Sequence, residues 1–127
     1  MTAPYRSVAF VCTTGDTCPL QGSVEIRTWL KAEAKKRGIK GVRVNASGCL
    51  NQCGHGPMLV VYPDDVWYAH VDRAAAERIL EEHLVGGTPV RDLEYRPVRP
   101  GANKLPRDEA TKAVLRDHPE YKPCNRC

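Results

Sequence analysis

The chain has 127 residues and a formal net charge of +4, which is enough sequence for one hydrophobic core and short for two. No apolar run approaches bilayer-spanning length, and the N-terminus lacks the charged-then-apolar layout of a signal peptide, so we expect no membrane contact and a cytoplasmic location. The basic residues form no dense run and few aromatic residues accompany them, which argues against nucleic-acid binding.

The first half of the chain predicts a strand, a helix and a second strand. The apolar run 7–11 is typical of a buried strand and ends at Cys12. Ser23 is expected to cap a helix that runs to Arg37. Residues 42–45 follow as a strand, and the helical connection predicts that this strand lies parallel to the first.

Two further strands and a second helix are predicted next. Residues 58–62 and 67–71 indicate an antiparallel hairpin, because the Pro-Asp sequence between them favours a tight turn. Asp72 can cap a helix over 73–84, which a pair of glycines ends. The resulting order β-α-β-β-β-α is the minimal thioredoxin-like α/β arrangement, with a mixed four-stranded sheet.

The composition changes near residue 90. Six of the ten prolines lie beyond Gly87, and the charge balance there is more basic. We therefore expect a domain over 1–90 and an irregular, proline-rich C-terminal extension over 91–127, which lies along the domain or hangs free. Within the extension, residues 107–117 could form one short helix.

Four of the six cysteines are placed to bind a metal centre. Cys12 and Cys18 follow the first predicted strand, and Cys49 and Cys53 lie in a glycine-framed loop before the third. In the cytoplasm thiols stay reduced, so such cysteines are ligands or redox groups rather than disulfides. Four thiolates fit zinc or an iron–sulfur cluster. The wide C-x5-C and C-x3-C spacings favour a [2Fe–2S] cluster, while a zinc module and a thiol–disulfide redox protein stay open.

Three glycines and a histidine belong to the same loop. Gly48, Gly54 and Gly56 would let backbone N–H groups approach the cluster and tune its potential, Gly54 most directly. His55 is expected to be a solvated loop residue.

The remaining cysteines, Cys124 and Cys127, form a terminal C-x2-C pair. They lack the strand-and-helix setting that activates such pairs, so we assign them no catalytic role.

The sequence also resembles a known family over roughly residues 6–90. Five segments resemble the thioredoxin-like [2Fe–2S] ferredoxins: Val11–Thr14, Cys18–Ile26, Gly48–Pro57, Val66–Tyr68 and His83–Val90. The resemblance implies that Cys12, Cys18, Cys49 and Cys53 are the cluster ligands.

The family implies a function without catalytic residues. It implies a one-electron carrier between redox protein partners, and a homodimer. The short Cys12–Cys18 spacing is closer to the small [2Fe–2S] subunit of NADH dehydrogenases and related hydrogenases, so a subunit of a larger complex is the alternative. No nucleotide-binding glycine motif occurs, so we do not expect this chain alone to be a dehydrogenase.

Overall fold

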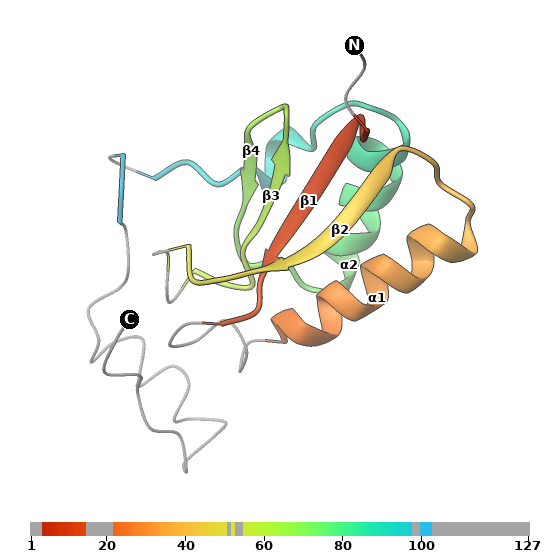
Figure 1. Ribbon diagram of the computed structural model, residues 1–127. Coiled ribbons are helices and arrows are strands. Elements are labelled where there is room, and N and C mark those ends of the chain that lie inside the picture. The colour runs from red at the N-terminus through yellow and green to blue at the C-terminus, as the bar shows by residue number, and fades with distance from the viewer. Residues whose placement is uncertain (1–3, 15–21, 51, 53–54, 98–99, 103–127) are drawn as a thin grey trace.

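A mixed four-stranded sheet organises the fold in this computed structural model (Figure 1). The structure describes residues 4–14, 22–50, 52, 55–97 and 100–102. The strands are β1 (Ser7–Cys12), β2 (Val42–Ser47), β3 (Leu59–Tyr62) and β4 (Val66–Tyr68), in the spatial order β2-β1-β3-β4. β1 pairs in parallel with β2, whereas β3 is antiparallel to both β1 and β4. The predicted fold class, parallel pair and hairpin are confirmed.

Both helical segments cover one face of this sheet. α1 (Ser23–Lys36) contributes Ile26, Leu30 and Ala34 to a core that also contains Ala9 and Val11 of β1. The same core includes apolar residues of α2 (Arg73–Arg78) and of η2 (Ile79–Val85), a π-helical continuation of α2. The two helices therefore pack against each other and leave the opposite face of the sheet to other segments (Figure 1).

The start of α1 differs from the prediction. Gly22, with φ of +92°, occupies the cap position, and no side chain caps the helix. Ser23 is the first helical residue and is fully buried, and among the described residues its Oγ has no hydrogen-bond partner. The predicted Ser23 cap is wrong, because the left-handed turn that starts the helix suits glycine.

The end of β4 also differs from the prediction. The strand covers Val66–Tyr68 rather than 67–71. His70 has φ of +51°, and its N–H donates to the carbonyl of His55 at 2.8 Å. The N–H of Val71 donates to the carbonyl of Pro57 at 3.0 Å. The backbone thus leaves the β3 ladder after Tyr68 to bind the loop that precedes β3.

The cap and the end of the second helix agree with the sequence. Asp72 Oδ1 accepts a hydrogen bond from the N–H of Ala75 at 2.8 Å, which confirms the predicted cap. The helix ends at Val85 with Gly86 as its C-cap, and Gly87 follows with φ of +78°. The predicted helix over 73–84 is therefore present, as α2 and η2 together.

A polar network centred on the buried Tyr68 and His83 fastens the hairpin to this helix. The Tyr68 hydroxyl lies 2.8 Å from His83 Nδ1, and His83 Nε2 lies 2.7 Å from Asp64 Oδ2 in the β3–β4 turn. The same hydroxyl accepts the N–H of Val90 at 3.0 Å. The His83 tautomer with its proton on Nε2 is compatible with all these bonds, since the Tyr68 hydroxyl then donates to Nδ1 and the ring donates to Asp64.

The beginning of the C-terminal extension lies against β4. η3 (Arg91–Leu93) leads to Glu94, which forms an isolated antiparallel bridge with Tyr68. The N–H of Tyr95 then donates to the carbonyl of Trp67 at 2.6 Å. The boundary at residue 90 stays a prediction, and the expected helix at 107–117, like Cys124 and Cys127, falls outside the described residues. Within the described part of the chain, no helix combines the length and the apolar character needed to cross a membrane.

Candidate metal centre

Cys12 lies at the C-terminal end of β1, with 2% of its surface exposed. Its N–H donates to the carbonyl of Met58 at 3.0 Å, and its Sγ lies 3.2 Å from the carbonyl oxygen of Thr14. The side chain belongs to a small apolar cluster on the sheet face opposite the helices. Packed with Cys12 in this cluster are Met58, Leu50, Trp67, Ala69 and Tyr95.

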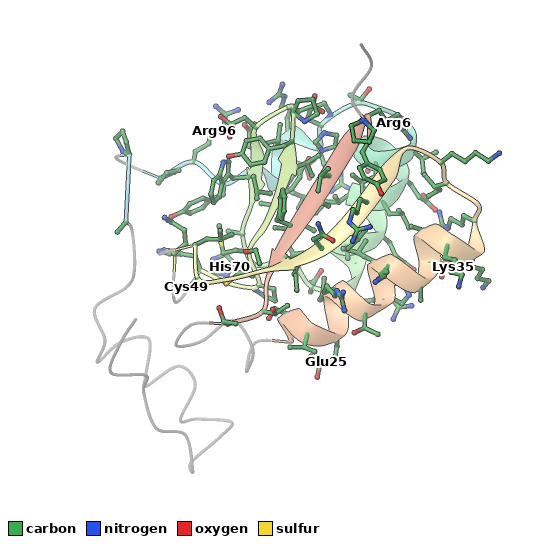
Figure 2. All side chains as sticks on the ribbon, in the orientation of Figure 1. Arg6, Glu25, Lys35, Cys49, His70 and Arg96 are labelled. Carbon is green, nitrogen blue, oxygen red and sulfur yellow. The ribbon has the colours of Figure 1, made fainter. Side chains whose placement is uncertain are left out.

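The parallel pairing of β1 and β2 brings Cys49 to the same edge of the sheet. Cys12 is in register with Ser47, so Cys49 lies two residues beyond the partner of Cys12. The N–H of Thr13 donates to the carbonyl of Ser47 at 3.2 Å and holds the two chain segments together past the strands. Figure 2 shows Cys49 at the end of the sheet opposite Arg6. Two predicted ligands from distant parts of the sequence therefore leave the sheet side by side.

The other two predicted ligands, Cys18 and Cys53, lie outside the described residues. Within the described ranges, no group of three or more His, Cys, Asp or Glu side chains could hold a metal ion. The four-cysteine assignment consequently stays a prediction.

Gln52 ties the loop to the C-terminal extension, a contact that the sequence did not predict. Its side chain is buried, and Nε2 donates to the carbonyl of Gly101 at 2.9 Å and to that of Leu50 at 3.3 Å. Its Oε1 accepts the Tyr95 hydroxyl at 2.7 Å. Burial raises the pKa of Tyr95, so the hydroxyl keeps its proton at neutral pH and acts as the donor.

His55 is half-buried rather than the solvated residue that we expected. Its ring lies 5.5 Å from the ring of Tyr95 and 6.1 Å from that of His70, measured between centroids. The N–H of His55 also donates to the carbonyl of Gln52 at 3.1 Å. The loop around the predicted ligands thus packs on aromatic side chains from two other segments.

The described part of the site fits a sulfur-bound cluster. One thiol is buried among apolar groups and the other, that of Cys49, is half-buried, and soft thiolates are the ligands that iron–sulfur clusters require. A Cβ added to Gly48, next to Cys49, would meet no described atom within 4 Å. Gly48 has no positive φ, so the backbone itself does not require glycine there.

Comparisons with known proteins decide the family. The chain is 38% identical over 96 residues to a [2Fe–2S] ferredoxin from Clostridium pasteurianum, a match that covers 67% of this chain and 91% of the relative. A [2Fe–2S] ferredoxin from Aquifex aeolicus is 48% identical over 50 residues, or 39% of this chain and 45% of the relative. The chain belongs to the [2Fe–2S] ferredoxins. No family model matches the chain.

Solved structures of the thioredoxin-like [2Fe–2S] ferredoxin from Aquifex aeolicus extend this result to the fold. The wild-type structure matches with a TM-score of 0.65 and 30% identity, over 75% of this chain and all of that chain. A second structure matches with a TM-score of 0.67 and 31% identity, over 77% of this chain and 96% of that chain. Ferredoxins transfer electrons and are not enzymes, so the predicted family, fold and class of protein are confirmed.

Proposed function

We propose that this ferredoxin carries one electron on a [2Fe–2S] cluster held by Cys12, Cys18, Cys49 and Cys53. The observation that supports the ligand set is the register of β1 and β2, which brings Cys12 and Cys49 to one edge of the sheet. Their positions on two separate segments suit a cluster whose irons are each held by a pair of cysteines. When bound, the cluster supplies the redox chemistry.

The protein residues hold the cluster and control its exposure. Cys12 is buried in the apolar cluster with Met58, whereas Cys49 is half-buried at the sheet edge. Electrons would therefore enter and leave on the Cys49 side, because electron transfer is fastest where little protein separates the two centres. No side chain needs to act as an acid, a base or a nucleophile.

Ferredoxins exchange electrons with redox protein partners. We further propose that the chain forms a homodimer, that it acts in the cytoplasm and that it binds neither nucleic acid nor membranes. These proposals extend the expectations from the sequence, and light scattering of the purified protein tests the dimer directly.

The experiment that tests the function is metal analysis of anaerobically purified protein. We expect about two iron and two acid-labile sulfide per chain, with a visible spectrum that bleaches on reduction with dithionite. Zinc without sulfide would replace the proposal with a zinc module. Protein without metal would favour thiol–disulfide chemistry.

Single substitutions test the ligands. Cys12→Ala and Cys49→Ala should each abolish cluster assembly, because a missing thiolate leaves one iron incompletely coordinated. Cys124→Ala is the matched control and should keep the full spectrum. Full iron content and an unchanged spectrum in Cys49→Ala would show that the ligand assignment is wrong.

A further inference from the structure

The first described part of the C-terminal extension reaches the loop between two proposed ligands. We define the C-terminal brace as residues 94–97 and 100–102. Its residues Tyr95 and Gly101 bind the side chain of Gln52, which lies between Cys49 and Cys53 in the sequence. These contacts join residues 43 and 49 positions apart.

The brace is itself firmly attached to the sheet. Glu94 bridges to Tyr68, and its carboxylate accepts hydrogen bonds from Arg91 at 3.0 Å and Arg96 at 2.9 Å. The N–H of Tyr95 donates to Trp67 at 2.6 Å. Tyr95 therefore presents its hydroxyl from a fixed backbone position, which is what a support for a loop requires.

The brace also contacts residues around Cys12, the other proposed ligand that the structure describes. The Tyr95 ring packs against the apolar cluster that contains Cys12 and Met58. The same ring also meets His55, at 5.5 Å between centroids. One residue outside the predicted domain thus touches the environment of both cysteine segments.

The connection between the brace and the loop lies beside a groove. The groove has a volume of about 400 Å³ and is lined by Leu50, Gln52, Trp67, Tyr95, Pro97, Gly101 and Ala102. The hydrogen bonds of Gln52 and the ring contact between Tyr95 and His55 join the two segments there. Loss of the Gln52 bonds would weaken this connection and give water more access to the chain next to Cys49.

We propose that Tyr95 and Gln52 are positioning residues for the cluster: the C-terminal brace holds Gln52, three residues after Cys49, in place, and thereby slows loss of the cluster and limits the access of water to it. This inference rests on the proposed function. It gives the start of the extension a role in the properties of the cluster, and it requires no contact between Tyr95 and the cluster itself.

Metal release and the reduction potential test the proposal in the full-length holoprotein. Tyr95→Phe removes one hydroxyl and keeps the ring, so the rate of cluster loss to an iron chelator should rise roughly two- to tenfold, as expected for one hydrogen bond. The reduction potential should also become more positive, because water stabilises the more negative reduced cluster. The matched control is Tyr5→Phe, which removes a hydroxyl from an exposed tyrosine and should change neither quantity.

A second variant shows whether Tyr95 acts through Gln52. Gln52→Ala removes both bonds to the brace and should accelerate cluster loss at least as much as Tyr95→Phe. The double variant should be no faster than Gln52→Ala alone, because the hydroxyl then has no partner left. If Tyr95→Phe does not fold, Gln52→Ala decides the question by the same two measurements.

Several outcomes would overturn the proposal. A release rate and a potential equal to those of Tyr5→Phe would show that the brace does not control the loop. If the increases in the rate of cluster loss caused by Tyr95→Phe and by Gln52→Ala multiply in the double variant, Tyr95 acts independently of Gln52. If the wild type holds zinc, the proposed function fails, but zinc release from the same variants still tests the brace; if it holds no metal, both proposals fall.

Discussion

The buried network of Tyr68, His83, Asp64 and Val90 yields a sharp prediction for stability. Tyr68 and His83 are 0% and 1% exposed, so water cannot replace bonds lost there. Tyr68→Phe keeps the ring in the core but removes one oxygen. The Tyr68 hydroxyl is hydrogen-bonded to His83 Nδ1 and accepts the N–H of Val90. Its removal therefore leaves two buried groups without partners.

The magnitude follows from those two orphaned groups. Each buried group without a partner costs about 1–3 kcal/mol, so Tyr68→Phe should lower the free energy of unfolding by roughly 2–6 kcal/mol. For a chain of this length, at about 4 °C per kcal/mol, the melting temperature should fall by roughly 8–24 °C. Burial also raises the pKa of Tyr68, so the hydroxyl remains a donor throughout the neutral range.

The measurement is thermal unfolding of the holoprotein at one scan rate. Tyr62→Phe is the control, because Tyr62 is 41% exposed and its substitution should change stability by less than about 0.5 kcal/mol. The double variant Tyr68→Phe/His83→Leu should recover part of the loss, since the unpaired imidazole nitrogen is then gone. Equal melting temperatures for Tyr68→Phe and Tyr62→Phe would refute the reasoning.

Two further predictions concern the helix cap and the surface charges. Asp72→Ala should destabilise the protein by about 1 kcal/mol, because it removes the bond to the N–H of Ala75. Ser23→Ala should be neutral or stabilising, because the Ser23 hydroxyl makes no capping bond. An equal loss of stability in both variants would contradict this. Asp92 accepts two hydrogen bonds from Arg78, at 2.6 Å and 2.9 Å, which lower the pKa of its carboxyl group. Because that pKa is lower in the folded state, the stabilisation is present above about pH 4 and is lost as the pH falls further. Calorimetry of wild type and Asp92→Asn should show a difference in melting temperature that shrinks at low pH and in high salt, and a constant difference would refute the ion pair.

The sequence predicted the elements well where the signal is local. The apolar run before Cys12, the Pro-Asp turn and the Asp72 cap each depend on a few neighbouring residues, and all three are present. The helical connection between the first two strands predicted their parallel pairing, which brings Cys12 and Cys49 to one edge of the sheet. Where two local signals compete, the prediction was wrong, as at Ser23, where the preceding glycine takes the cap position.

The sequence by itself determined the fold class, the family resemblance and the choice of cysteines as candidate ligands. Only the tertiary structure decided where β4 ends, which hydrogen bonds His83 makes and which residues support the loop around Cys49. The physical reason is that a hydrogen bond such as that between Tyr95 and Gln52 joins groups 43 residues apart and leaves no periodic pattern in either segment. Such contacts exist only once the sheet has brought the two segments to the same edge.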